Sequence, residues 1–332
     1  MPQIDFVSVV IPTFNRKDSL IRTIESLYRQ SYPKDRYEII VVDDGSTDDT
    51  RRCLDWFQKE YPSNLKYFYQ ENKGPGAARN LGVRNACAEI IAFIDSDCIG
   101  LERWIEEIAK GYEDSRVAGI GGTIVATPSD NKVSQYCAYT KMNEKPKIDK
   151  TGIVYLIIGN ASFRKSCLNL VGGFDERYNF PGGEDPDLCY RIKKNGFFFK
   201  YNPDAVVFNS HKQTLWEFII TYFHYGKGDA FLTLRKLSNW DLISISGVKW
   251  FFYFLKAAAK IVLMLINSFK LILWVFKIPF KSLAYYGEGL GMKDSFTYAA
   301  LDYVKICAFI NGWFLGYIIG KFKGFKISDN YK

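Results

Sequence analysis

EIIAFIDSDCIG, residues 89–100, carries a run of apolar side chains directly into two carboxylates, Asp95 and Asp97. In an extended chain, residues two positions apart point to the same side, so the negative charges of this pair would repel each other. A divalent cation between them would remove the repulsion, and carboxylate oxygens are ligands that Mg²⁺ and Mn²⁺ accept. Because an Asp-x-Asp pair can also cap a helix or form an Asx turn, the surrounding sequence has to decide between these interpretations.

The first hundred residues alternate between strand and helix patterns. Strands are predicted at 6–12, 37–43, 65–70 and 89–95, and helices at 19–28, after Asp48 and at 76–86. This βαβ series predicts an α/β domain with a parallel sheet that is covered on both faces. Ligands of such sheets bind at the carboxyl ends of the strands. The polar residues at these ends are Pro12 and Thr13, Asp43 and Asp44, Glu71 and Asn72, and Asp95 and Asp97. We therefore predict that these four strand ends form a single site.

The chain beyond Asp97 shows fewer regular patterns. A helix is expected at about 101–112, followed by a polar stretch, 128–150, that is typical of a surface loop. A further helix is predicted to begin near Glu184 and to end at Gly196, and residues 216–231 form an amphipathic helical pattern.

The charge of the chain is concentrated at its C-terminal end. Residues 231–332 carry 14 Lys and Arg against 5 Asp and Glu, whereas residues 1–230 carry 30 against 31. The basic region is also rich in aromatic and apolar residues, so its charge suits anionic lipid headgroups better than nucleic acid. We therefore expect a catalytic domain at 1–230, a helical membrane-associated region at 231–332, and no nucleic-acid partner.

The predicted location is the cytoplasmic face of the cell membrane. The first residues show no secretory signal, and the seven cysteines form no CxxC pair, which is typical of reduced, mostly buried thiols. Residues 261–278 are long enough to span a bilayer but contain Lys270, and 306–320 are only fifteen residues long. Spanning helices, a re-entrant hairpin, interfacial helices and a buried helical subdomain all remain open.

Two motifs suggest contacts to a nucleotide. In VVDDGSTDDT, residues 41–50, Asp43 and Asp44 could accept hydrogen bonds from a nucleobase or a ribose, although a plain turn with Ser46 or Thr47 as the helix N-cap is the alternative. In NKGPGAARNLG, residues 72–82, the glycines allow a close approach of the backbone, and Arg79 offers planar donors to a phosphate or to an acid.

PGGEDPDLCYR, residues 181–191, crowds three acids into the first turn of a helix. An ionised carboxylate presented there could act as a general base toward a hydroxyl, whereas simple N-capping would explain one of the three acids. His211 follows a strand and could be a third metal ligand or a structural hydrogen-bond partner.

Seven motifs in one order give the chain a family resemblance. VVIPTFNR, EIIVVDDGSTDDT, KGPGAARNLGV, IAFIDSDC, GNASFRKS, GGFDERY and GGEDPDLCYRIKKNG resemble those of family 2 glycosyltransferases with the GT-A fold, over about residues 5–225. The resemblance implies a Rossmann-like domain with a mixed, mainly parallel sheet. It also implies a metal-dependent, inverting transfer of a sugar from a nucleoside diphosphate donor, with UDP expected and GDP as the alternative.

The resemblance assigns roles to individual residues. Asp185 is the expected base, and Glu184 contacts hydroxyl groups of the acceptor or of the donor sugar. Asp97 holds Mn²⁺ or Mg²⁺ on the diphosphate, and Asp95 contacts the ribose or the metal. His211 is a further candidate ligand because of its position after a strand, and the resemblance does not assign it. The residues expected at the nucleotide are Pro12, Thr13, Asp43, Asp44, Arg79 and Asp95.

The acceptor is less sharply indicated. The sequence lacks the QxxRW motif of processive synthases, which favours transfer of one sugar. The apolar tail favours a hydroxyl of a lipid-linked glycan or another acceptor near the membrane, and a polyprenyl phosphate that accepts the sugar itself is the alternative. A sugar nucleotidyltransferase or a dinucleotide oxidoreductase would need a phosphate loop where IPTFNRKDS stands. A membrane-tethered binding protein is the non-enzymatic alternative, and it would tolerate loss of the acids that are present in this chain.

Overall fold

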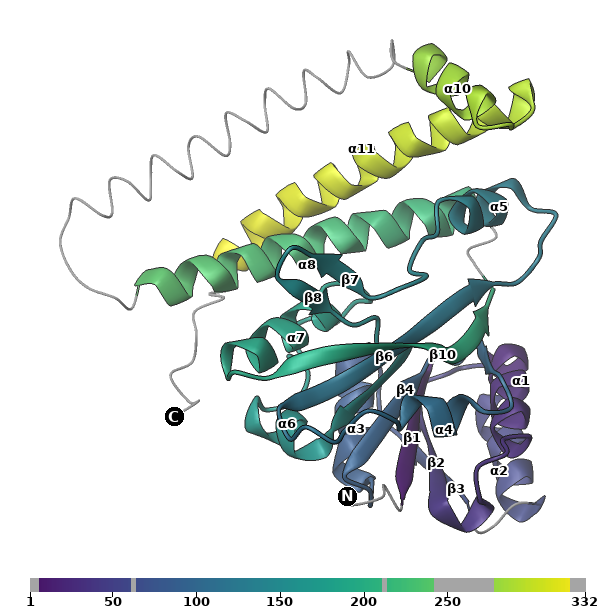
Figure 1. The fold of residues 1–332 in the computed structure, drawn as a ribbon, viewed down its shortest axis with the longest axis vertical. Coiled ribbons are helices and arrows are strands. Elements are labelled where there is room, and N and C mark those ends of the chain that lie inside the picture. The colour runs from purple at the N-terminus through teal and green to yellow at the C-terminus, as the bar shows by residue number, and fades with distance from the viewer. Residues whose placement is uncertain (1–5, 61–63, 211–213, 242–277, 323–332) are drawn as a thin grey trace. The chain divides into compact units, whose positions relative to one another are not determined.

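The computed structural model describes residues 6–60, 64–210, 214–241 and 278–322 in two compact units (Figure 1). The first unit comprises Met1–Asp130 and Cys137–His211, and the second comprises Asn131–Tyr136 and Lys212–Lys332.

The first unit is built on an eight-stranded sheet with the order β3-β2-β1-β4-β9-β6-β10-β5. Its strands are β1 (Val7–Thr13), β2 (Tyr37–Asp43), β3 (Leu65–Tyr69), β4 (Ile90–Ile94), β5 (Cys98–Gly100), β6 (Val117–Ala126), β9 (Asn160–Arg164) and β10 (Phe198–Asn209). The pairs β3–β2, β2–β1, β1–β4 and β6–β10 are parallel, whereas β9 is antiparallel to both β4 and β6, and β5 is antiparallel to β10. This architecture confirms the mixed, mainly parallel sheet expected from the motifs.

Helices cover both faces of this sheet. The helices are α1 (Lys17–Tyr28), α2 (Thr50–Glu60), α3 (Pro75–Asn85), α4 (Trp104–Ile108), α6 (Lys165–Leu170) and α7 (Glu184–Lys194). One apolar cluster joins the sheet to α1, α2 and α4, and a second joins it to α3, α6 and α7. Val9 and Val10 are neighbours in β1 but belong to different clusters, because successive side chains of a strand point to opposite faces.

Two predictions about the middle of the chain are wrong. The helix expected at 101–112 is shorter and comprises only α4. Residues 98–100 before it form β5, which pairs with β10, and Gly111 after it adopts a positive φ of 98° that a helix does not contain. The stretch 128–150 is not simply a loop, since it contains helix α5 (Lys132–Tyr139) and strand β7 (Lys147–Asp149), which pairs with β8 (Gly152–Tyr155). The side chains of Tyr136 and Cys137 are fully buried, which gives α5 its packing face.

The second unit contains three long helical segments, α8 (Leu215–Asp241), α10 (Ile278–Gly287) and α11 (Met292–Phe322). Glycines bring α8 and α11 together: a Cβ added at Gly226 would lie 1.9 Å from the carbonyl oxygen of Phe309, and one at Gly312 would lie 1.8 Å from that of Phe223. By length and composition, Met292–Gly320 could cross a membrane. This helix includes the predicted segment 306–320, whereas the other predicted span, 261–278, lies outside the described residues except for its last residue.

Two glycines of α3 provide a test of how tightly this helix packs on the sheet. A Cβ at Gly82 would lie 2.4 Å from Cγ1 of Val10, whereas one at Gly76 would lie 3.3 Å from Cβ of Phe174. Both changes to alanine gain about 1 kcal/mol of helix propensity, but only Gly82→Ala forces β1 and α3 apart. We expect Gly82→Ala to lower the free energy of unfolding by about 1–3 kcal/mol and Gly76→Ala to change it little, as measured by urea unfolding. Equal effects of the two substitutions would contradict this packing.

Candidate functional site

The carboxyl ends of β1, β2 and β4 bring the predicted polar residues to one edge of the sheet. Thr13 is in register with Asp43 across the β1–β2 pair, and the backbone N–H of Asp44 donates to the carbonyl of Thr13 over 2.9 Å. Pro12 precedes Thr13 in the same strand, and Asp95 follows the last residue of β4. Among the described residues, the buried hydroxyl of Thr13 has no hydrogen-bond partner, so it is available to a ligand.

Asp43 and Asp44 are both buried and both hold loops in place. Asp43 accepts a hydrogen bond from the N–H of Ser46 at 2.8 Å and one from the hydroxyl of Tyr67 at 3.2 Å. Burial of the phenol and the negative charge of Asp43 raise the pKa of Tyr67, so this hydroxyl stays a donor. Neither Ser46 nor Thr47 caps α2 as the alternative interpretation suggested: Asp48 accepts from the N–H of Thr50, the first residue of that helix.

Asp44 organises the loop that leads into α3. Its Oδ1 accepts from the side chain of Gln70 at 2.6 Å and from the N–H of Lys73 at 2.9 Å, and its Oδ2 accepts from the N–H of Gly74 at 2.9 Å. Gly74 has a φ of 94°, which a residue with a Cβ rarely adopts, and Pro75 then starts the helix. Asp44 thereby fixes where α3 begins, and so where Arg79 lies.

Arg79 is the centre of the site. Its side chain is only 6% exposed, and it donates to Asp95 at 3.0 Å and to Glu184 at 3.1 Å. Asp185 lies 4.0 Å from the same guanidinium, which also stacks over the ring of Phe174. The structure thus unites Arg79 and Asp95 with the predicted ED pair, and the guanidinium supplies the positive charge that Asp95 requires.

The ED pair is presented by two glycines with positive φ. Gly182 and Gly183 turn the chain into α7, and Glu184 accepts from the N–H of Gly182 at 2.7 Å as well as from Arg79. Asp187 is a structural residue, because it is fully buried and pairs with Arg191 at 2.8 Å. The three acids of this turn therefore have three different sets of contacts, which N-capping alone would not explain.

Asp185 is the acid of the site whose pKa is raised by its surroundings. Its Oδ2 accepts from the N–H of Ile158 at 3.0 Å, while its buried Oδ1 has no hydrogen-bond partner in the part of the chain that the structure describes. Burial raises the pKa of Asp185 well above its ordinary value, and the negative charge of Glu184 adds to this, whereas Arg79 works in the opposite direction. A carboxyl with an elevated pKa and an oxygen that accepts no hydrogen bond is suited to accept a proton.

Asp97 is held by two partners that the sequence did not reveal. Arg16 forms an ion pair with its Oδ2, and the side-chain amide of Asn209 donates to its Oδ1 at 2.9 Å. Asn209 ends β10, two residues before His211, so the position of a polar residue at a strand end is the signal that could have identified it. His211 itself lies outside the described residues, and its predicted role as a metal ligand stays a prediction.

The charge of the site suits a divalent cation. The carboxylates of Asp95, Asp97, Glu184 and Asp185 face two guanidinium groups, which leaves two negative charges when all four acids are ionised. A Cβ at Gly159 would lie 2.6 Å from Oδ2 of Asp95, so a larger residue at this position would displace the carboxylate. Within the described ranges, no group of three or more His, Cys, Asp and Glu side chains is arranged for a metal, so the fit depends on Asp95 and Asp97.

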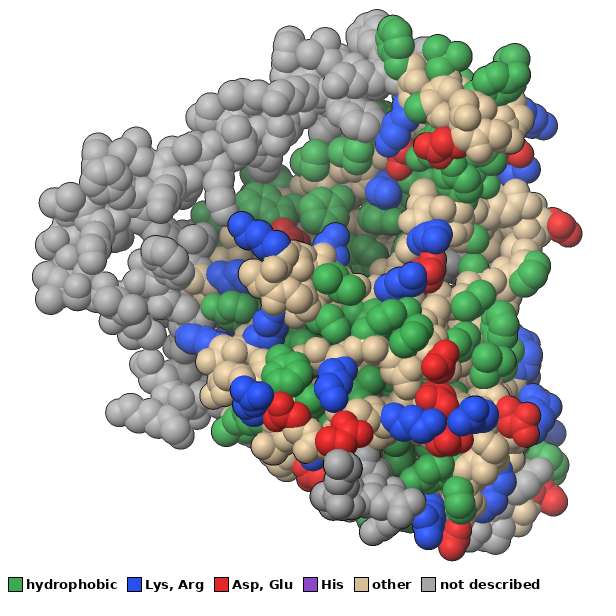
Figure 2. Space-filling model, viewed as in Figure 1, with side chains coloured by type: hydrophobic (Ala, Val, Ile, Leu, Met, Phe, Trp, Pro, Cys, Tyr) green, Lys and Arg blue, Asp and Glu red, His purple; other side chains and the backbone are tan. Residues whose placement is uncertain are grey.

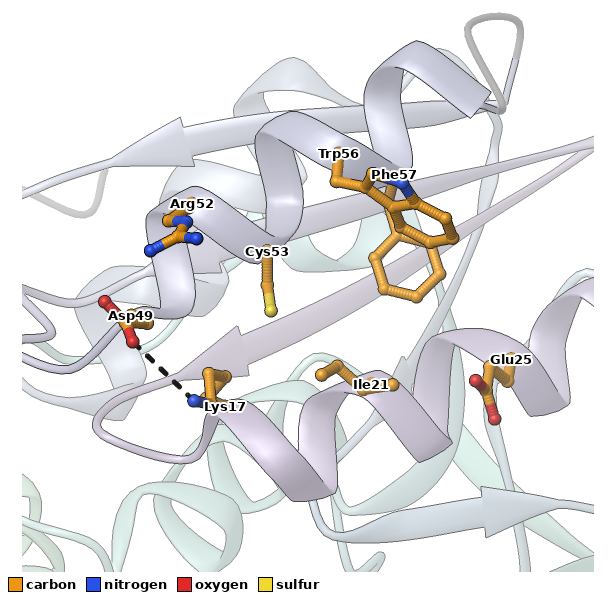
Figure 3. Close-up of a pocket in the computed structure, with 8 residues that line it drawn as sticks. All are labelled: Lys17, Ile21, Glu25, Asp49, Arg52, Cys53, Trp56 and Phe57. Atoms are coloured by element: carbon orange, nitrogen blue, oxygen red, sulfur yellow. Dashed lines mark ion pairs between the residues drawn. The ribbon is translucent and has the colours of Figure 1, made fainter.

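A separate pocket lies between α1 and α2 and contains none of the predicted site residues. It has a volume of about 420 Å³, and Figure 3 shows its charged end at the ion pair of Lys17 and Asp49 and its aromatic end at Trp56 and Phe57. None of its lining residues contributes to the acidic cluster around Arg79, so this pocket is distinct from the candidate site.

Comparisons with known proteins agree with this geometry. Residues 8–171 match the model of a family described as glycosyl transferase family 2. The pre-mycofactocin glycosyltransferase of Mycobacterium tuberculosis is 31% identical over 247 residues, which cover 73% of this chain and 50% of the relative. Glycosyltransferase AglE of Haloferax volcanii is 28% identical over 67% of this chain and 72% of its own length. This chain thus spans half the length of the first relative and about three quarters of the second.

Solved structures share the fold. The mannosyltransferase PcManGT from Pyrobaculum calidifontis, in complex with GDP-Man and Mn²⁺, has a TM-score of 0.60 and 22% identity over 92% of this chain and 87% of its own. TarS of S. aureus in complex with UDP-GlcNAc has a TM-score of 0.52 and 20% identity over 69% of this chain and 66% of its own. Together with the family match, these similarities confirm the GT-A fold class expected from the motifs.

Arg79 is expected to be essential for stability because it is the buried cation of an acidic cluster. Arg79→Gln would leave Asp95, Glu184 and Asp185 without it, and we expect a loss of about 3–5 kcal/mol in the free energy of unfolding at neutral pH. The loss should shrink at acidic pH, where the carboxyl groups become protonated. Arg103→Gln is the control, since Arg103 is 63% exposed in its pairs with Glu106 and Glu107 and should cost less than about 1 kcal/mol. Similar losses for both variants in urea unfolding would refute the central role of Arg79.

Proposed function

The chain belongs to glycosyl transferase family 2 through residues 8–171, and from this we propose that it transfers one sugar, with inversion, from a nucleoside diphosphate sugar to a hydroxyl group of a lipid-linked glycan or another acceptor near the membrane. One observation carries the proposal: Arg79 gathers carboxylates from β4 and α7 at the end of the sheet where nucleotides bind. The names of the relatives, and the GDP-Man and UDP-GlcNAc complexes of two structures with this fold, support a nucleotide-sugar donor.

The donor nucleoside is proposed to lie over the ends of β1 and β2. The hydroxyl of Thr13, which has no hydrogen-bond partner among the described residues, is available to this nucleoside, and the backbone at Pro12 adjoins it. Asp43 and Asp44 have acceptor oxygens in the neighbouring strand end. We expect uridine, with guanosine as the alternative. Arg79 supports this nucleotide indirectly, because its two terminal nitrogens are engaged by Glu184 and Asp95.

Asp185 is proposed to be the general base. Its Oδ1, which accepts no hydrogen bond from the described residues, takes the proton of the acceptor hydroxyl. The hydroxyl oxygen forms a bond to the anomeric carbon while the bond from that carbon to the diphosphate oxygen breaks. The nucleoside diphosphate leaves with the bonding electrons, so a single displacement inverts the anomeric centre. Glu184, the neighbour of this residue in the chain, is proposed to orient hydroxyl groups of the acceptor or of the donor sugar. A Mn²⁺ or Mg²⁺ ion held by Asp95 and Asp97, with His211 as a further candidate ligand, would neutralise the charge of the leaving diphosphate.

Residues 231–332 are proposed to associate with the membrane and to bring the catalytic domain, residues 1–230, to the cytoplasmic face. Figure 2 shows apolar side chains gathered on α10 and at the start of α11. The most exposed of them are Phe280 at 74%, Leu283 at 66%, Met292 at 75% and Phe296 at 56%. Exposed aromatic and aliphatic side chains in a region of positive net charge are typical of a surface that binds anionic lipids.

Calorimetric titration with UDP and with GDP, each with and without Mn²⁺, tests the donor class. We expect one nucleotide to bind at least about tenfold more tightly in the presence of Mn²⁺, and Asp97→Ala to abolish this metal dependence because it removes the proposed ligand. Asp18→Ala, in the first turn of α1, is the matched control and should behave like the wild type. If neither nucleotide binds to the wild type, the proposed function is wrong.

Asp185→Asn separates the two acceptor classes and should also reveal a cost to stability. With a hydroxyl acceptor, turnover should fall by about 10²–10⁴-fold, whereas near-normal turnover would favour the already ionised phosphate of a polyprenyl acceptor.

The same variant tests the effect of Asp185 on stability. Because the pKa of Asp185 is raised in the folded protein, its contribution to stability is greatest below its unfolded pKa and is lost as the pH rises toward the folded pKa. The asparagine variant should therefore have a higher Tm than the wild type at pH 7, and the difference should vanish below about pH 4. A lower Tm at pH 7 would contradict the raised pKa.

A further inference from the structure

The two arginines of the site differ in their freedom to move. Arg79 is 6% exposed and is held by three carboxylates, so its guanidinium is a permanent part of the fold. The side chain of Arg16 is 41% exposed, and it forms an ion pair with Asp97. The site thus contains one buried cation and one that is partly exposed to solvent.

The backbone that carries Arg16 is firmly anchored. Asn15 adopts a positive φ of 51°, its N–H donates to Ser46 at 2.9 Å, and its side-chain oxygen accepts from the N–H of Thr47 at 2.7 Å. On the other side, the N–H of Lys17 donates to Asp48 at 3.2 Å. The backbone around Arg16 is therefore held in place, so an exchange of partners would require movement of its long side chain alone.

Both oxygens of Asp97 are engaged in this structure. Asn209 donates to Oδ1 and Arg16 pairs with Oδ2. Asn209 is neutral and can remain beside a metal-bound carboxylate, but a guanidinium and a divalent cation on the same carboxylate oxygens would repel each other strongly. A metal ion can therefore use Asp97 only when Arg16 withdraws.

We propose that Arg16 is an exchangeable counter-ion: it neutralises Asp97 while the donor site is empty and moves onto the diphosphate when metal and nucleotide bind. The inference rests on the proposed function and adds a residue to which that function gives no role. A planar guanidinium can form two parallel hydrogen bonds with phosphate oxygens as readily as with a carboxylate, so the exchange replaces one charge-assisted contact with another. Its consequence is that the metal binds weakly alone and well with the nucleotide, which is a positive coupling between the two ligands.

Arg16→Met tests the exchange, because methionine keeps an unbranched side chain but carries no charge. Binding of Mn²⁺ alone, followed by electron paramagnetic resonance of the free ion, should become about tenfold tighter, since the guanidinium of Arg16 no longer competes for Asp97. In the presence of Mn²⁺, binding of UDP or GDP, whichever the wild type accepts, should become about tenfold weaker, since the diphosphate loses a charged donor. If the nucleotide alone binds as before, the coupling between metal and nucleotide should therefore fall by about tenfold, because both changes belong to the same thermodynamic cycle.

Arg22→Met is the matched control, since Arg22 is an exposed arginine of α1 and should leave both affinities unchanged. Unchanged or weaker binding of Mn²⁺ to Arg16→Met would overturn the proposal, as would unchanged nucleotide binding. The double variant Arg16→Met with Asp97→Ala should bind Mn²⁺ no better than Asp97→Ala alone. If wild type and control bind no nucleotide, the proposed function fails, while the comparison of Mn²⁺ affinities still tests whether Arg16 competes for Asp97.

Discussion

The structure depends on one buried cation. Arg79 is surrounded by Asp95 from the end of β4 and by Glu184 and Asp185 from the start of α7, and none of these acids could approach the others closely without it. The position of Arg79 depends in turn on Asp44, which binds the loop before α3 through two backbone N–H groups. Asp44 therefore influences the position of Glu184 and Asp185, because it fixes the start of α3 and so the position of the Arg79 guanidinium.

The sheet could be predicted from the sequence because its strands carry local signals. β2 agrees residue for residue with the predicted 37–43, since its apolar run is bounded by turn residues, and β1, β3 and β4 differ only at their ends. The prediction of a loop at 128–150 is wrong because the polar composition of this stretch hides one buried face, on which Tyr136 and Cys137 lie. Amphipathic packing of so short a helix depends on tertiary partners more than on its own composition.

The site could be predicted only in part. The end of a strand can be recognised from neighbouring residues in the sequence, whereas a pair of side chains from distant segments cannot. The motifs identified which acids face the same edge, yet Arg79 and Glu184 are 105 positions apart, and no pattern in one sequence pairs them. The pairs of Asp97 with Arg16 and Asn209 were missed for the same reason, since each joins distant segments. The run of three acids alone likewise did not distinguish Asp185 from Asp187, and only the family resemblance chose Asp185. Within the described part of the chain, Oδ1 of Asp185 accepts no hydrogen bond, whereas Asp187 pairs with Arg191 one helical turn away.

The burial and neighbouring charges that make an ionised Asp185 destabilising also make its pKa sensitive to a bound ligand. Its pKa is raised by burial and by the neighbouring charges of Glu184 and Asp95, and a part of this shift would disappear if positive charge were bound beside Asp95. Under the proposed function, binding of the donor with its metal would therefore lower the pKa of Asp185 and ionise the base when a sugar is available to be transferred. Without a donor, the pKa of Asp185 would stay raised, which disfavours its ionised form when there is no anomeric carbon to attack. An acid that was fully solvated could not respond in this way, because water would screen it from the charge of the metal.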